Sequence, residues 1–271
     1  MQLVIDPTGG VAGDMFAAAL ISAGADEKLM IDAMLLAAHK IGDATIEVNT
    51  TDDGAKRLTM QVEHHHGHLS GHKAYHLLEH IFEDLKIEGL YRDFGFKALD
   101  ILVKAEIKAH KENTFLTDHI HSHTHHHHEH DHHHSHSHHH DHDHPHEDAY
   151  LHEAQDILID ITGAAYGLQL LNSPTEAVLT NAVSWGGGHI TFSHGHMPVP
   201  APATKIIFDT NELPGVMGPI DVELCTPTGS SILAALKAKT DSDIKGEILK
   251  TGISRGGKDL PIPPLKIEIW K

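Results

Sequence analysis

A histidine-rich stretch in the middle of the chain constrains the fold of the segments on either side of it. Its sequence is HSHTHHHHEHDHHHSHSHHHDHDHPHED. It runs from His121 to Asp148 and contains no Leu, Ile, Val, Met, Phe, Tyr or Trp. Without apolar side chains, the stretch cannot offset the entropy lost on ordering its backbone. We therefore expect one globular unit interrupted by a disordered insertion, with an N-terminal half over residues 1–116, the insertion over 117–148 and a C-terminal half over 149–271.

The same composition favours metal binding. Neutral imidazole binds Co, Ni, Cu and Zn, and its unperturbed pKa of about 6.5 leaves most copies able to ligate at neutral pH. The irregular, mid-chain position argues against a purification tag, and the lack of apolar support argues against a catalytic site. A solvated low-complexity spacer is the alternative. The predicted metal ligands in this segment are His125, His126, His127, His128, His132, His133 and His134.

Composition excludes several other classes of protein. The net charge of −18, with histidine counted as neutral, disfavours nucleic acid as a partner, since phosphate contacts need clustered Lys and Arg. No apolar run reaches about 18 residues, which predicts that no segment spans a membrane. The start of the chain, MQLVID, has no basic region typical of a signal peptide, and Cys225 is the single cysteine. We therefore expect a cytoplasmic protein.

The segment LVIDPTGGVAGDMFAAALISAG predicts a strand, a tight turn and a helix that Gly24 ends. It is not a Walker loop, because the Lys-Ser/Thr ending is missing. Asp6 at the strand end and Asp14 at the helix start suit a divalent cation, alone or bridging to a phosphate. Alternatively, Asp14 is an ordinary N-cap and Asp6 a turn former.

Three further segments combine helical spacing with histidine or carboxylate side chains. His72, His76 and His80 are four residues apart and share one helix face, while Leu77, Ile81 and Leu85 are expected to enter the core. Glu106 and His110 share a face of the next helix. The helix after the insertion has a predicted buried stripe of Ile157, Ile161, Ala164, Ala165 and Leu168, with His152, Glu153, Asp156 and Asp160 on another sector. Such pairs build metal sites in helical bundles, although a solvated charged face is the alternative for each helix.

Two later segments add candidate ligands. In HGHMPVPAPAT, His194 and His196 point to one side of an extended chain, and three prolines behind them predict a stiff, polyproline-like support. In CTPTGSSIL, hydroxyl groups and free N–H groups at a predicted helix start suit a phosphate, with N-capping by Thr228 as the alternative. The predicted phosphate contacts are Thr226, Thr228, Gly229 and Ser230, together with Arg255 and Lys258.

Alternation of strands and helices around the insertion predicts an α/β fold, with α+β as the alternative. Seven segments occur along the chain in a fixed order: DPTGGVAGDM, HKAYHLL, AEIKAH, LHEAQDILIDITG, HGHMPVPAPAT, CTPTGSSIL and GISRGGKDLPIP. Together with the histidine-rich insertion, they resemble the LarC family, the nickel-insertion proteins of nickel-pincer nucleotide biosynthesis. HGHMPVPAPAT and the HExxD helix are the most specific parts of the resemblance.

The resemblance implies a cyclometallase that inserts Ni²⁺ into a pyridinium mononucleotide carrying two thiocarboxylates. CTP is consumed with Mg²⁺ or Mn²⁺, and the product serves lactate racemase and related acceptor apo-enzymes. Forming a carbon–nickel bond displaces a ring proton, so a base is needed. His152 or Glu153, directly after the insertion, is the predicted catalytic base. Asp6, Asp14, Glu106, His110, His194 and His196 are the predicted metal ligands outside the insertion.

Longer family members continue into a C-terminal domain that resembles a nucleotide-binding, oligomerising module, whereas this sequence stops at LKIEIWK. If CTP binds in that domain, a separately made partner or a longer product would complete the reaction. Two other hypotheses stay open. The protein could be a nickel storage or delivery protein without catalysis of its own, or an unrelated small-molecule binding protein with an incidental histidine tract.

Overall fold

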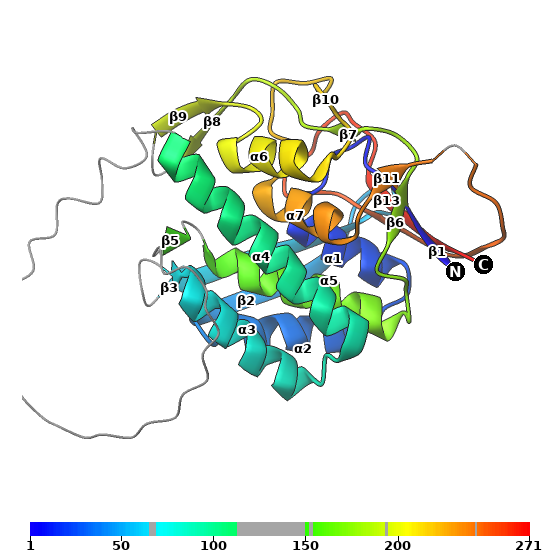
Figure 1. Ribbon diagram of the computed structural model, residues 1–271. Helices are drawn as coiled ribbons and strands as arrows, with labels where there is room; N and C mark the ends of the chain where they lie inside the picture. The colour runs from blue at the N-terminus through cyan, green and yellow to red at the C-terminus, as the bar shows by residue number, and fades with distance from the viewer. Residues whose placement is uncertain (65–68, 113–149, 152–153, 193–194, 242) are drawn as a thin grey trace, which may run out of the picture.

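The computed structural model describes residues 1–64, 69–112, 150–151, 154–192, 195–241 and 243–271, and these residues form an α/β fold, as expected (Figure 1). Its centre is a mixed seven-stranded sheet in the order β11-β6-β1-β13-β12-β3-β2. The strands are β1 (Gln2–Asp6), β2 (Gly42–Thr50), β3 (Lys56–His64), β6 (Ala177–Leu179), β11 (Lys239–Thr240), β12 (Ile248–Ser254) and β13 (Leu265–Trp270).

The two ends of the chain meet in this sheet. β1 pairs in parallel with β6 on one side and antiparallel with β13 on the other, where Gln2 lies opposite Trp270. Figure 1 shows the N- and C-termini beside each other at the end of this pair. The sequence LKIEIW suits a central strand, because Leu265, Ile267 and Ile269 alternate and are all buried.

The helices are α1 (Gly13–Ser22), α2 (Glu27–Ala38), α3 (Gly71–Leu85), α4 (Gly89–Glu112), α5 (Ala154–Leu170), α6 (Pro202–Asn211) and α7 (Pro227–Ala235). The shorter strands are β4 (Leu69–Ser70), β5 (Tyr150–Leu151), β7 (Val183–Ser184), β8 (His189–Phe192), β9 (Gly195–Pro198) and β10 (Gly215–Val216). α1 contacts β3, β12 and β13, and α5 contacts α1, α2 and α4. α1 therefore lies between the sheet and α5.

Both sides of the histidine-rich segment contribute to one hydrophobic core. α2 packs against α5, and α4 packs against α6 and α7 (Figure 1). The predicted turn before α1 is confirmed, with Gly24 ending the helix at a φ of +101°. The insertion itself, including all its predicted metal ligands, lies outside the described residues. In the part of the chain that is described, no helix has the length and apolar composition needed to cross a membrane.

Two expected helix faces differ from the structure. α5 has the predicted buried stripe, but Leu158, Ile159 and Asp160 are buried as well. This helix is covered on several sides by other helices, so Asp160 does not lie on a solvated face. In α3 the buried face is Ala74, Leu78, Ile81 and Phe82, whereas Leu77 and Leu85 are only partly buried.

Candidate functional site

A cavity rich in carboxylates opens where α1, α4, α5 and α7 meet. Its volume is about 300 Å³. The five acidic side chains in its wall come from four different parts of the fold, and no described histidine lines it. They are Asp14, Glu106, Asp156, Asp160 and Glu223. Gathering this many like charges is unfavourable unless protons or cations compensate them.

Asp160 is the most deeply buried member of this cluster. Its side chain is 6% exposed, and its Oδ1 atom has no hydrogen-bond partner among the described residues. Burial, together with the charges of Asp14 and Asp156, raises the pKa of Asp160 well above its usual range. A buried carboxyl oxygen without a hydrogen-bond partner lowers the stability of the fold. Such a residue is therefore a candidate for a functional role.

Asp14 lies in the first turn of α1, where its Oδ1 accepts a hydrogen bond from the Met15 N–H at 2.8 Å. Burial is the main cause that raises the pKa of Asp14 to about 6, and the charge of Asp156 adds to it. With this pKa, Asp14 exchanges its proton at a pH not far below neutral. A cation bound beside Asp14 and Asp160 would displace their protons, because it favours the ionised carboxylates.

The cluster is not a ready-made metal cage. Across the ranges that the structure describes, no three His, Cys, Asp or Glu side chains converge closely enough to hold an ion. A cation here would be bound by one or two carboxylates and complete its shell with water, substrate atoms or side chains outside those ranges.

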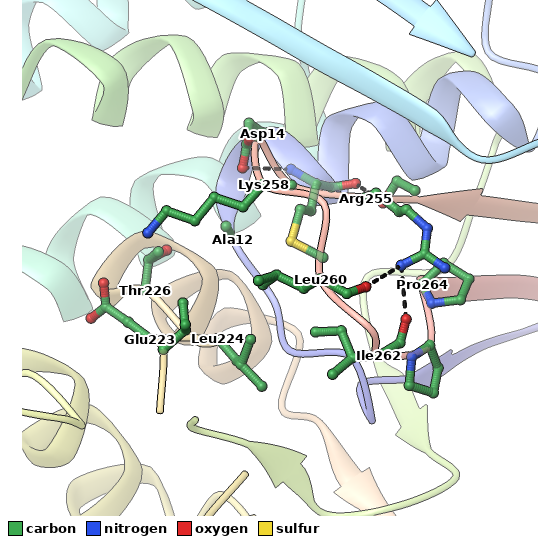
Figure 2. A pocket seen from close by; sticks show the side chains of 17 residues that line it. Ala12, Asp14, Glu223, Leu224, Thr226, Arg255, Lys258, Leu260, Ile262 and Pro264 are labelled. Carbon is green, nitrogen blue, oxygen red and sulfur yellow. Dashed lines mark hydrogen bonds between the residues drawn. The ribbon is translucent and has the colours of Figure 1, made fainter. Parts of the chain in front are cut away.

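A second cavity of about 280 Å³ adjoins the first and shares Ala12, Asp14, Glu223 and Thr226 with it (Figure 2). Its other wall is the loop that follows β12, from Arg255 to Pro264. In Figure 2 the side chain of Lys258 extends across this cavity toward the side where Thr226 and Glu223 lie. An ammonium group beside a helix N-terminus is a suitable environment for a phosphate.

The helix that faces this space is α7, and its start is firmly positioned. Thr226 is the N-cap, because its Oγ1 accepts a hydrogen bond from the Gly229 N–H at 3.1 Å. The cap is thus Thr226 and not Thr228. A Cβ on Gly229 would lie 2.1 Å from the Val11 carbonyl oxygen, so this close approach requires glycine. Thr226 and Thr228 line the cavities, whereas Gly229 and Ser230 are buried.

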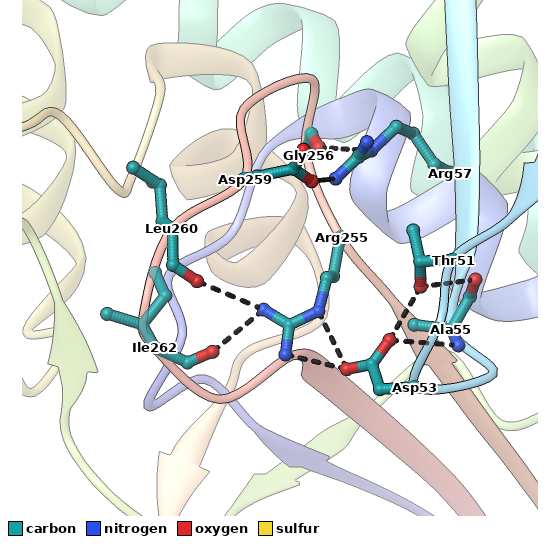
Figure 3. A network of polar contacts seen from close by, with 9 residues as sticks. All are labelled: Thr51, Asp53, Ala55, Arg57, Arg255, Gly256, Asp259, Leu260 and Ile262. Carbon is teal, nitrogen blue, oxygen red and sulfur yellow. Dashed lines mark hydrogen bonds and ion pairs between the residues drawn. The ribbon is translucent and has the colours of Figure 1, made fainter.

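Arg255 is committed to a structural network (Figure 3). Its Nε donates to Asp53 at 2.7 Å, and its Nη1 donates to the carbonyl oxygens of Ile262 at 2.8 Å and Leu260 at 3.5 Å. The Arg255 guanidinium beside Asp53 also holds the pKa of that carboxyl well below its usual range. Arg255 therefore fixes the loop that walls the second cavity, and its predicted phosphate contact would require this network to open.

Asp6 does not join Asp14. Its Oδ1 accepts hydrogen bonds from the Thr8 N–H at 3.1 Å, from the Thr8 hydroxyl and from Asn181 at 3.3 Å. Burial acts to raise the pKa of Asp6, but these bonds and the charge of Lys266 outweigh it, so the pKa is lowered. Asp6 lines neither cavity. It serves as the turn former that the sequence allowed as the alternative.

The remaining predicted ligands are dispersed. Glu106 lines the carboxylate cavity, while His110, one turn further along α4, does not. His196 is exposed on the hairpin of β8 and β9, where its ring stacks on that of His189 with centroids 4.7 Å apart. The start of the expected polyproline-like segment, up to Pro198, is thus a β-strand of this hairpin. His152, Glu153 and His194 lie outside the described residues. Cys225 is buried and lines neither cavity.

Sequence reasoning missed three residues of the carboxylate cavity. Helical spacing places Asp156 and Asp160 on one sector of their helix without indicating a cavity, and no motif in the sequence points to Glu223. A signal for Asp160 existed in the run ILIDITGAA, where an aspartate sits inside an otherwise apolar helix segment. A lone acid in such a run is either buried or paired.

These features define a class: an α/β protein with a carboxylate-lined cavity next to a second cavity that Lys258 and the N-terminus of a helix line. A family model described as nickel insertion protein matches residues 3–125 and 135–267. The chain belongs to this family, which confirms the resemblance seen in the sequence. No solved structure matches it.

Two curated relatives are named pyridinium-3,5-bisthiocarboxylic acid mononucleotide nickel insertion protein. The one from Akkermansia muciniphila is 28% identical over 271 residues, which covers 96% of this chain and 58% of that protein. The one from Alkaliphilus metalliredigens is 28% identical over 284 residues, again covering 96% of this chain and 58% of the relative. The chain thus spans somewhat more than half the length of these relatives.

Proposed function

We propose that this protein takes part in inserting nickel into pyridinium-3,5-bisthiocarboxylic acid mononucleotide, as a metal-inserting enzyme of nickel-pincer cofactor biosynthesis. The observation that carries the proposal is the adjoining pair of cavities. One offers oxygen ligands to a cation, and the other offers Lys258 and the N-terminus of α7 to the substrate phosphate. The family membership and the names of the relatives support nickel as the metal and this mononucleotide as the substrate.

The chemistry of the carboxylate cavity suits a nickel ion in transit. The ion must be released to two substrate sulfurs, so its protein ligands should be few, exchangeable and harder than thiolate. Asp14 and Asp160 meet this requirement, while the buried Cys225 does not compete. Formation of the carbon–nickel bond releases the ring proton to a base. His152 or Glu153 remains our proposal for this base, and both directly precede α5, whose Asp156 and Asp160 line the cavity.

The proposal includes CTP with Mg²⁺ or Mn²⁺, because the family resemblance implies it. It also includes a separately supplied C-terminal portion and an acceptor apo-enzyme of the lactate racemase type. Carboxylate oxygens are the ligands that Mg²⁺ and Mn²⁺ prefer. The alternative function, nickel storage or delivery without catalysis, is favoured by the composition of the histidine-rich segment.

An insertion assay tests the proposal. The full chain is incubated with Ni²⁺, the bisthiocarboxylic acid mononucleotide, CTP and Mg²⁺, with and without the C-terminal portion of a full-length relative, and the nickel-containing product is identified by mass spectrometry. We expect product that disappears when CTP is omitted, and loss of product in Asp160→Asn and Lys258→Ala. Asp93→Asn, which changes an exposed carboxylate of α4, is the matched control. Nickel binding without product in any combination would favour storage or delivery.

A further inference from the structure

Helix α3 carries three histidines on its solvent-exposed face, and two of them converge. The Nε2 atoms of His72 and His76 lie 3.2 Å apart, with ring centroids 4.5 Å apart and ring planes inclined by 70°. His80, one turn further on, is directed elsewhere, since its Nδ1 lies 3.5 Å from a carboxylate oxygen of Glu83. All three histidines are outside both cavities.

The separation of the two ring nitrogens matches two ligands on one metal ion. Imidazole nitrogens bind zinc and similar ions at about 2.1 Å, and neighbouring ligands at angles of 90–110° are then about 3.0–3.4 Å apart. The observed 3.2 Å lies within this interval. In the absence of metal, the same pair can share one N–H hydrogen bond, so the arrangement does not leave either nitrogen unsatisfied.

The helix holds the two rings in register. Residues four apart share a face, which is the spacing that HExxH helices use to bind zinc. α3 is anchored by Ala74, Leu78 and Phe82 on its opposite, buried side, and Ser70 caps its first turn by accepting a hydrogen bond from the Lys73 N–H. Because the backbone is already fixed, binding costs mainly the side-chain freedom of two exposed rings.

We propose that His72 and His76 form a bidentate surface site for Ni²⁺ or a similar borderline divalent cation such as Zn²⁺ or Cu²⁺, with water as the remaining ligands. Two imidazoles select such ions against Mg²⁺ and Ca²⁺, which prefer oxygen. A helix fixes the two ligands of this site. It also shares no residue with the carboxylate cavity, so it stands independently of the insertion reaction.

Residue-resolved histidine footprinting tests the site in the full chain. The protein is treated with diethylpyrocarbonate without metal, with Ni²⁺ in excess of the capacity of the histidine-rich segment, and with Mg²⁺. Peptide mass spectrometry then reports modification of each histidine separately, so nickel on residues 121–146 does not obscure the result. We expect Ni²⁺ to protect His72 and His76 and Mg²⁺ to protect neither.

Variants distinguish a shared ion from independent binding. His76→Ala should abolish the protection of His72, and His76→Gln should do the same while keeping a polar side chain of similar length. The matched control is His80→Ala, which removes an exposed histidine of the same face but should leave the protection of His72 and His76 intact. Equal modification of the pair with and without Ni²⁺, or protection of His72 that survives in both His76 variants, would overturn the proposal.

Discussion

Gly13, at the start of α1, lies directly against the buried carboxyl group of Asp160 in α5. A Cβ at position 13 would be 2.1 Å from Asp160 Oδ2 and 2.4 Å from its Cγ. This contact brings the N-terminus of one helix to the side chain of another across a segment of nearly 150 residues. It places the unsatisfied carboxyl group beside Asp14, and so it builds the centre of the carboxylate cavity.

Replacing Gly13 with alanine should therefore destabilise the protein. Asp160 is buried and cannot swing into solvent, so the added methyl group must displace α1 or α5. Overpacking of this kind costs about 1–3 kcal/mol. Urea unfolding at pH 7.5 measures the change. Gly257→Ala is the control, because a Cβ there meets no atom within 4 Å. Equal stability of the two variants would show that the contact with Asp160 is not tight.

Asp14 should make the stability of the protein depend on pH in the direction opposite to that of most carboxylates. Its pKa is raised from 3.8 to about 6 in the fold. Between these values the folded state binds more protons than the unfolded state, so stability falls as pH rises through this interval and is level above it. The burial of Asp14 thus lowers stability at neutral pH.

Asp14→Asn removes this penalty while keeping an oxygen that can accept the Met15 N–H. A change of one pKa unit corresponds to about 1.4 kcal/mol, and the lost charge at a helix N-terminus opposes the gain by about 0.3–1 kcal/mol. Because the pKa shift is about two units, we expect the free energy of unfolding to rise by about 2–3 kcal/mol at pH 7.5 and by less at pH 4. Asp93→Asn should show no such difference. A loss of stability in Asp14→Asn at both pH values would contradict this account.

Sequence patterns predicted those parts of the fold that depend only on residues close together in the chain. The strand, glycine turn and helix around Asp14 follow from residues close together in sequence, and so does the shared face of His72 and His76. The apolar run around Asp160 indicates that this side chain is either buried or paired, but local patterns do not decide between the two. Helical periodicity places it beside the apolar stripe, but its exposure depends on whether α1 and α4 cover that side.

The role of Arg255, in the loop after β12, could not be predicted from local sequence either. The sequence SRGGKD suggested two cations around glycines, both available to a phosphate. In the structure Arg255 is paired with Asp53, which lies 202 residues earlier, and only Lys258 extends into the cavity. Which of two neighbouring cations is structural depends on such a distant partner. The turn residues alone do not contain this information.

Arg255 and Lys258 should therefore respond differently to substitution. The compact ammonium group of Arg255→Lys cannot span Asp53 and two carbonyl oxygens as the planar guanidinium does. The Ile262 N–H, which donates to the Leu260 carbonyl oxygen at 2.8 Å, should therefore lose protection against hydrogen exchange. Lys258→Ala should leave that protection unchanged. Lys258→Ala should instead weaken binding of the mononucleotide, measured by calorimetry. Unaltered exchange in Arg255→Lys would mean that the network does not hold the loop.

Deletion of residues 118–147 should lower the amount of nickel that the protein binds without abolishing nickel insertion. The deleted segment carries most of the histidines, and imidazole is the ligand that gives the chain its expected capacity for nickel. The carboxylate cavity and the paired histidines of α3 lie entirely outside it. Equilibrium dialysis should therefore show a large fall in bound nickel, with a remainder that persists. Insertion at saturating nickel should continue, while insertion at limiting nickel should slow because the local supply of the ion is lost. Loss of insertion even in excess nickel, with the fold intact by circular dichroism, would show that the segment acts in the reaction itself and not as a reserve of metal.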